Sequence, residues 1–320
     1  MQDLAVLNRQ DVFGLVPFER AVETITDALT GGLDPTREPA RSRVDIANGQ
    51  FLVMPSDESS YCGVKVLSVA RDNTAYGLPA VQGQYLLFEQ PTLRPVAVID
   101  ASALTELRTP AVSLSAVLPV LPARADLEVV VFGQGVQAYA HLDCLLAVLP
   151  KGADIGRATF VARRPDPLRT ARYDMAESLG ALDKEVGRRL AGADLVICAT
   201  GAREPLFDSG LIRDESVVVA VGSHEPDARE VDGRLGARAT VVVEDVATAL
   251  RESGDVVLAV REGLLDPDDL VPLKDFVSDA AARERSAGRP VFFKSSGMAW
   301  EDLAVAARAY RRHTGQDAAS

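Results

Sequence analysis

The chain has 320 residues, a formal net charge of −12 and 47% hydrophobic residues. Its length predicts about two domains with substantial cores. The acidic balance argues against nucleic acid and for small-molecule partners. No apolar run approaches the roughly 18 residues of a membrane span, and the charged N-terminal segment predicts no signal peptide. The three cysteines lie far apart without a C-x-x-C pair, so we expect reduced thiols in a cytoplasmic protein.

The first third of the chain predicts one helix followed by short strands. Apolar residues recur at helical spacing from Ala21 to Leu29, with Pro17 suited to the first turn and a Gly-Gly pair at the end. Consecutive apolar runs separated by turn residues then predict an antiparallel sheet, with strands at 51–54, 64–69, 81–88 and 96–99. A helix over 102–118 closes this part, and prolines mark a domain boundary near residue 119.

The stretch 127–148 combines a β-branched run, a glycine turn and an amphipathic helix without a break. This is the context in which a G-x-G-x-x-A motif binds a dinucleotide rather than forming a bare structural turn. Its first glycine permits the tight turn, its second lets the backbone approach a pyrophosphate, and the helix N-terminus attracts the phosphates. The expected cofactor-binding residues are Gly133, Gly135, Val136, Gln137 and Ala138.

Beyond this motif, strands alternate with helices, which predicts a doubly wound parallel sheet and an α/β fold. We expect a helix around 170–179 and an alanine-rich amphipathic helix over 298–312 that returns to the first domain. The further strands are expected at 157–162, 195–199, 217–221, 240–243 and 291–293.

Arg163 and Arg164 follow the second strand of this region, where an Asp or Glu normally binds the adenosine ribose of NAD. Two guanidinium groups suit the 2′-phosphate of NADP, which they bind bidentately. We therefore expect NADP(H) to be preferred, with NAD(H) possible. The alternatives are a solvated arginine pair, or Asp166 reaching the ribose.

Three cations of the first domain are candidates for binding an anion. Lys65 lies inside an apolar strand, where a cation is costly unless it is paired or faces a polar cavity. Taken singly, Arg41, Lys65 and Arg108 are more typical of surface charges. Together, facing a nucleotide domain, they would bind the carboxylate of an amino or imino acid.

Among the three histidines, His224 is the functional candidate, because it follows a predicted strand where ligand sites of α/β proteins gather. A surface histidine is the alternative reading. His141 and His313 have no metal-ligand spacing, so we expect no metal.

Short runs spread along the chain carry a family resemblance. They are PAR (39–41), MP (54–55), GVKV (63–66), GLP (77–79), LTELRT (104–109), GQGVQA (133–138), AT (199–200), GSHEPDAREVD (222–232), VED (243–245) and FKSSG (293–297). Their order and spacing resemble the ornithine cyclodeaminase/mu-crystallin family over nearly the whole chain.

The resemblance implies a central Rossmann domain over residues 120–299 and an α+β substrate-binding and dimerisation domain built from residues 1–119 with 300–320. It also implies a homodimer in which NAD(P)(H) faces a small amino or imino acid. By position, the family's substrate-carboxylate cluster is Arg41, Lys65 and Arg108, and Thr200 joins the expected cofactor site.

Three positions depart from true cyclodeaminases. The glutamate before Met-Pro is Leu52, the catalytic aspartate is His224, and a threonine after Gly-Leu lies at Ala80. Cyclisation with loss of ammonia needs carboxylate acid/base groups near the reacting carbon. We therefore expect an NAD(P)H-dependent oxidoreductase acting at the C–N bond of a small amino or imino acid, with Lys65 and His224 as catalytic candidates. The alternatives are an ornithine or lysine cyclodeaminase and a cofactor-dependent small-molecule binding protein.

Overall fold

The computed structural model describes residues 4–58 and 60–316. The chain divides into two compact units, residues 1–112 with 298–320 and residues 113–297. Over the described ranges, no helix is long and apolar enough to cross a membrane.

The first unit contains a six-stranded sheet in the order β1-β6-β5-β4-β3-β2. Neighbouring strands in this sheet run antiparallel, except that β1 pairs in parallel with β6. Because β3 to β6 follow one another both along the chain and across the sheet, they form an antiparallel meander of the kind the sequence predicts. The strands are β1 (Ala5–Leu7), β2 (Ser42–Ile46), β3 (Gly49–Asp57), β4 (Tyr61–Val69), β5 (Val81–Glu89) and β6 (Arg94–Asp100).

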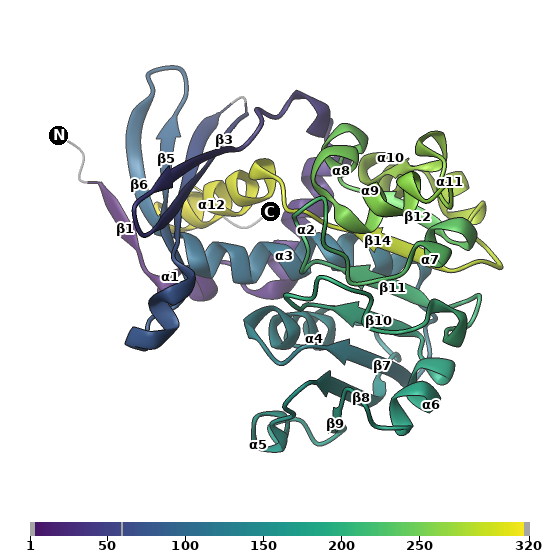
Figure 1. The fold of residues 1–320 in the computed structure, drawn as a ribbon. Helices are drawn as coiled ribbons and strands as arrows, with labels where there is room; N and C mark the ends of the chain where they lie inside the picture. The colour runs from purple at the N-terminus through teal and green to yellow at the C-terminus, as the bar shows by residue number, and fades with distance from the viewer. Residues whose placement is uncertain (1–3, 59, 317–320) are drawn as a thin grey trace. The chain divides into compact units, whose positions relative to one another are not determined.

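One face of this sheet is covered by the last helix of the chain. The helix α12 (Ala299–His313) packs against β3, β4 and β5 and against α2 (Phe18–Thr30), and Figure 1 shows it in yellow along the sheet. Its side chains Trp300 and Leu303 are fully buried. The unit also holds α1 (Arg9–Leu15), and α3 (Ala101–Val117) begins in it.

The second unit contains an eight-stranded parallel sheet in the order β13-β12-β14-β11-β10-β7-β8-β9. The central strands β7, β10, β11 and β14 are almost entirely buried, as expected for a parallel sheet covered on both faces. The strands are β7 (Leu127–Phe132), β8 (Ile155–Ala162), β9 (Ala176–Gly180), β10 (Leu195–Cys198), β11 (Val217–Ala220), β12 (Thr240–Val243), β13 (Val271–Pro272) and β14 (Val291–Lys294).

Helices follow most of these strands, as parallel connections require. Figure 1 shows α8 to α11 gathered beside β12 and β14. The helices are α4 (Val136–Val148), α5 (Pro167–Thr170), α6 (Glu185–Gly192), α7 (Gly233–Arg238), α8 (Val246–Glu252), α9 (Gly254–Arg261), α10 (Leu273–Ser278) and α11 (Ala280–Glu284).

The predicted α/β fold class is confirmed, and two local predictions are corrected. Pro17 is the N-cap of α2 rather than a residue of its first turn. The helix expected around 170–179 is wrong, because α5 ends at Thr170 and β9 forms an edge strand beside β8. Each residue of β9 is half-buried, so this segment lacks the one-sided apolar pattern that separates strand from helix. The sequence analysis also had no strand at β1, β2 or β13.

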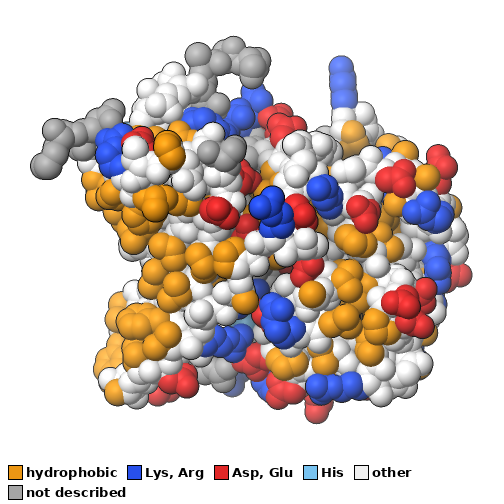
Figure 2. Space-filling model, turned by 90° about the horizontal axis from the view of Figure 1, so that it is seen from above, with side chains coloured by type: hydrophobic (Ala, Val, Ile, Leu, Met, Phe, Trp, Pro, Cys, Tyr) orange, Lys and Arg blue, Asp and Glu red, His pale blue; other side chains and the backbone are white. Residues whose placement is uncertain are grey.

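Surface charges of opposite sign lie next to one another. Figure 2 shows basic and acidic side chains interspersed over the face that it draws. Ion pairs among the described residues include Arg203 with Glu225 and Arg238 with Asp214. Exposed pairs of this kind contribute little to stability.

Candidate functional site

The predicted glycine motif forms a turn between β7 and α4. Gly133 has a φ of +110°, and a Cβ there would lie 2.5 Å from the carbonyl oxygen of Ala199. Only glycine suits both constraints. Gly135 is the N-cap of α4 and has open space where a Cβ would stand, whereas Ala138 is fully buried in the helix. A phosphate can therefore approach the helix N-terminus at Gly135.

Gln134 ties this turn to the loop that follows β8. Its side-chain amide donates to Ser178 Oγ at 3.0 Å, and its carbonyl oxygen accepts from the Asp166 amide at 2.7 Å. Arg163 and Arg164 are exposed on that loop. The Asp166 carboxylate accepts from two backbone amides at the start of α5, so its side chain already has a capping role.

Thr200 lies just beyond the carboxyl end of β10, held by a buried carboxylate. Glu230 accepts from the Thr200 amide at 2.7 Å, from its hydroxyl at 2.8 Å and from the Gly222 amide at 2.7 Å. Burial raises the pKa of Glu230, although the charge of Lys294 opposes the shift. Through these bonds the Glu230 carboxylate holds the backbone just beyond the adjacent strands β10 and β11. The candidates Val136 and Gln137 lie in the first turn of α4, directly after Gly135.

His224 is exposed on the loop that follows β11, as the sequence predicts. A buried ammonium group holds the start of this loop, because Lys294 Nζ donates to the Ser223 carbonyl oxygen at 2.6 Å. Arg203 binds both residues that flank Pro226, with 2.6 Å to Glu225 and 2.5 Å to Asp227. The backbone on either side of the imidazole is thus restrained.

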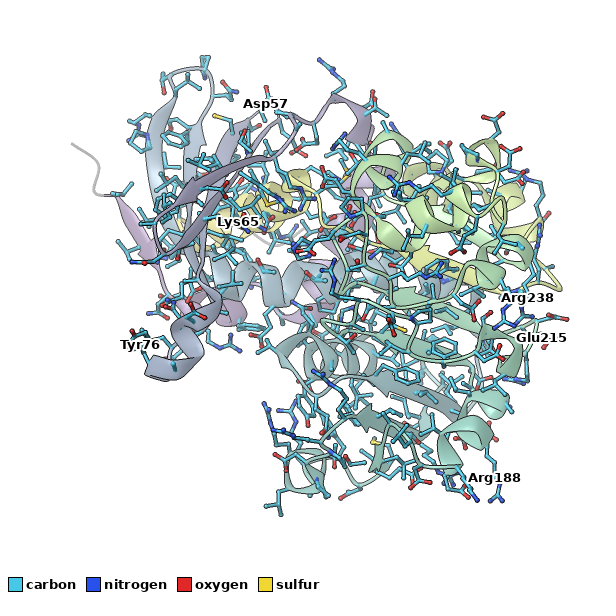
Figure 3. All side chains as sticks on the ribbon, viewed as in Figure 1. Asp57, Lys65, Tyr76, Arg188, Glu215 and Arg238 are labelled. Atoms are coloured by element: carbon cyan, nitrogen blue, oxygen red, sulfur yellow. The ribbon has the colours of Figure 1, made fainter. Side chains whose placement is uncertain are left out.

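Lys65 and Arg108 share a buried cluster with two carboxylates of α12. Lys65 Nζ donates to Asp302 Oδ2 at 2.6 Å, Arg108 donates to Glu301 at 2.6 Å, and Arg108 Nε lies 3.6 Å from Asp302 Oδ1. Figure 3 labels Lys65 where β4 faces α12. Burial lowers the pKa of Lys65 to about 8, although the charge of Asp302 opposes this. The structure therefore brings two of the three predicted cations together.

Arg41, the third predicted cation, comes directly before β2. The next residue, Ser42, pairs with Val53, and Met54 pairs with Lys65 on the neighbouring strand. The register thus places Arg41 at the β2 edge of the sheet, two strands from Lys65.

Glu301, Asp302, Glu230 and Lys294 were missed by the sequence analysis. A signal for the first two was present, because both lie between Trp300 and Leu303 in an otherwise apolar helix segment. Carboxylates on a buried helix face require partners, and Lys65 was the unexplained interior cation. The signal for Glu230 and Lys294 is weaker, since Glu230 lies in the long loop after β11 and Lys294 is the last residue of β14, with no recognisable spacing between them.

His141 has a structural role in α4. Its Nε2 lies 3.0 Å from Ser113 Oγ, and its Nδ1 lies 2.7 Å from the Gln137 carbonyl oxygen. Burial lowers its pKa to about 4, so the ring is neutral at physiological pH. Within the described part of the chain, no group of three or more His, Cys, Asp or Glu residues could hold a metal ion.

The glycine turn under a parallel sheet defines a dinucleotide-binding protein of the Rossmann type. The sequence model of the ornithine cyclodeaminase/mu-crystallin family matches residues 4–317. The chain therefore belongs to this family, as its short sequence runs predict.

Similar proteins include two groups of reductases. The chain is 32% identical to a Delta(1)-pyrroline-2-carboxylate reductase of Paracoccus denitrificans over 76% of this chain and 77% of the relative. It is 29% identical to the ketimine reductase mu-crystallin of Rattus norvegicus over 92% and 90%. Among solved structures, Thermococcus litoralis Delta(1)-pyrroline-2-carboxylate reductase in complex with NADH and L-proline has a TM-score of 0.82, at 26% identity and 98% coverage of both chains.

The buried cluster can be tested by removing its charges singly and in pairs. Asp302→Leu leaves Lys65 as an unpaired buried charge and should destabilise the fold by about 3–5 kcal/mol. Adding Lys65→Met should restore most of this loss, because two apolar side chains replace the ion pair. The measurement is the free energy of unfolding in urea. Equal destabilisation by the single and double variants would contradict the pairing.

Proposed function

We propose that the protein is an NAD(P)H-dependent reductase acting at the C–N bond of a small imino or amino acid. The observation that carries this proposal is the buried cluster of Lys65 and Arg108, present together with the glycine turn in a chain of this family. The two reductases named above act on the imine class of substrate that the proposal requires. Leu52 and His224, where the family's cyclodeaminases have carboxylates, favour reduction over loss of ammonia.

Lys65 and Arg108 contribute +2 and Glu301 and Asp302 contribute −2, so the four groups sum to zero. A substrate carboxylate therefore meets no net negative charge at the cluster. By position in the family, Arg41 is the third cation of the proposed site. We therefore assign Arg41, Lys65 and Arg108 to the carboxylate of the substrate.

A bound nicotinamide supplies the hydride, and the protein supplies orientation and a proton. Only a protonated imine accepts hydride well, so an acid must serve the substrate nitrogen. Lys65 and His224 are the two candidates. Imidazole exchanges its proton near neutral pH, since its unperturbed pKa is about 6.5. Gly133, Gly135, Val136, Gln137, Ala138 and Thr200 are the proposed cofactor contacts.

The direct test is reduction of Delta(1)-pyrroline-2-carboxylate and other cyclic imino acids, followed by loss of reduced-nicotinamide absorbance. We expect stoichiometric consumption of cofactor and no ammonia from ornithine supplied with catalytic NAD(P)+. Proline formed from ornithine at substantial turnover would replace the reductase proposal with the cyclodeaminase alternative. Cofactor-dependent substrate binding without turnover would favour the carrier alternative.

The role of His224 can be measured separately. A general acid at His224 requires that His224→Ala lower kcat for imine reduction by about 10²–10⁴. His313→Ala, at the end of α12, is the matched control and should leave kcat unchanged. Undiminished reduction in His224→Ala would leave Lys65 as the proton donor and reduce His224 to a surface residue.

We further propose that the cofactor is NADP(H) in preference to NAD(H), supported by the exposed pair Arg163 and Arg164 beyond β8. Replacing both with Ser should lower kcat/KM for NADPH, at about 1.5–3 kcal/mol for each charge-assisted hydrogen bond lost. Use of NADH should change little. Arg188→Ser, on α6, is the control for loss of a surface guanidinium. A wild-type preference for NADH would overturn this assignment.

A second copy of the chain is the proposed partner of the exposed sheet face in the first unit. Val44 and Phe51 are register partners, and Ile46 lies two residues along β2, so the three share one face. They are 50%, 40% and 44% exposed. Met54 and Lys65 point to the opposite face, where α12 packs. Apolar side chains beside an unpaired edge strand are typical of an association surface.

Charge on this face should therefore prevent association. Val44→Glu with Phe51→Glu should convert a dimer to a monomer, measured by sedimentation velocity. Leu182→Glu changes a fully exposed leucine of the second unit and should not alter the assembly state. A dimer that persists in the double variant would contradict this interface.

A further inference from the structure

Buried polar atoms of the first unit that lack hydrogen-bond partners among the described residues include the Tyr85 hydroxyl, Asp302 Oδ1 and Glu38 Oε2. Tyr85 and Asp302 are fully buried. An unsatisfied buried polar group costs roughly 1–3 kcal/mol, so each of these three atoms calls for a partner.

These atoms lie on the same side of the sheet. Tyr85 pairs in register with Lys65, and its hydroxyl sits directly over Gly63, where any Cβ would overlap it. Gly63 and Lys65 are two residues apart on β4 and face the same way. Burial raises the pKa of Tyr85 well above its usual value, and the negative charges of Asp302 and then Glu38 raise it further. Both carboxylates are therefore electrostatic neighbours of the phenol.

Asp302 connects these atoms to the Lys65 ammonium group. Asp302 accepts a hydrogen bond from Lys65 Nζ through Oδ2, and its Oδ1, 3.6 Å from Arg108 Nε, is the second acceptor. A proton arriving at this carboxylate is thus one hydrogen bond from the amine.

Glu38, the other carboxylate beside Tyr85, lines a cavity of about 830 Å³ in the first unit. The Ser56 hydroxyl donates to Glu38 Oε1 at 2.9 Å, which leaves Oε2 as the buried acceptor. Other charged groups around the cavity are Asp27, Asp34, Arg37, Asp57 and Glu58. Figure 3 labels Asp57 at the end of β3.

The protonation of Glu38 suits exchange near neutral pH. Burial raises its pKa to about 7; Ser56 and the Trp300 backbone amide oppose the shift, and the charges of Asp57 and Glu58 add to it. Glu38 thus holds a proton below about pH 7 and releases it above that pH.

We propose that Glu38, Tyr85 and Asp302 form a water-completed proton path from the cavity to Lys65. A buried water needs two to four polar partners. Here the Tyr85 hydroxyl can donate a hydrogen bond to a water, and the carboxylate oxygens of Asp302 and Glu38 can accept one from it. The proposal rests on the reductase function and assigns Lys65 as the proton donor within it. Asp302, Tyr85 and Glu38 act through Lys65 and are relay residues.

The proton balance of one turnover is complete. Hydride passes from the reduced nicotinamide to the imine carbon, which oxidises the cofactor to NAD(P)+. The nitrogen takes a proton from Lys65 Nζ, and the neutral amine is then reprotonated through Asp302, Tyr85 and Glu38 from solvent. One imine, one NAD(P)H and one proton thus give one amine and one NAD(P)+.

The test compares Glu38→Gln and Tyr85→Phe with the wild type in imine reduction. In the wild type we expect kcat to fall as the pH rises through about 7, where Glu38 loses its proton. Glu38→Gln should remove this inflection and lower kcat by at least about tenfold, with KM unchanged. Tyr85→Phe should lower kcat and increase the solvent deuterium isotope effect. Asp27→Asn, at the same cavity, is the matched control and should keep the wild-type profile.

Chemical rescue separates a proton path from a structural role. Acetate, a small weak acid, should restore kcat in Glu38→Ala and should leave kcat unchanged in the wild type and in Asp27→Asn. Wild-type kcat, pH profile and isotope effect in Glu38→Gln and Tyr85→Phe would overturn the path while the reductase function stands. Loss of kcat without acetate rescue or a changed pH profile would overturn it as well. Absence of reductase activity in the wild type would instead overturn the proposed function on which the path rests.

Discussion

The ion pair between Lys65 and Asp302 is the interaction on which the first unit depends. It joins residues 237 positions apart in the sequence and fixes α12 against the six-stranded sheet. Desolvating two charges is expensive, and their mutual attraction offsets that cost only with good geometry and further hydrogen bonds. Arg108 and Glu301 complete the compensation. A stabilising core would more simply be apolar, which supports the proposed role of these charges in substrate chemistry.

A comparable arrangement organises the second unit. Glu230 and Lys294 are buried side chains whose hydrogen bonds go mainly to the backbone at the carboxyl ends of strands. Ligands of parallel α/β sheets bind at this edge. Through these bonds, buried charge restrains the backbone on which Thr200 and His224 lie.

Local signals in the sequence were sufficient for the centre of the second unit. The strand β7 and its glycine turn were predicted residue by residue, because a β-branched run and Gly133 act within a few neighbours. The segment containing α5 and β9 was not, because its strand is stabilised by pairing with β8 rather than by its own pattern. The partners of Lys65 could not be predicted either. A cation inside an apolar strand indicates that a counter-charge exists, but it does not indicate where in the sequence that counter-charge lies. The functional roles of all the candidate site residues, Lys65, Arg108 and the glycine motif included, remain predictions.

The dependence of the first sheet on α12 has a consequence for synthesis of the chain. Residues 113–297 leave the ribosome before α12 does, so the parallel-sheet unit can acquire its core while the first sheet still lacks its covering helix. Until then Lys65 and Arg108 have no carboxylate partners from α12, and the apolar face of the meander is open to water or to chaperones. Charge neutralisation and closure of that sheet therefore occur together, as one late event in the maturation of the polypeptide.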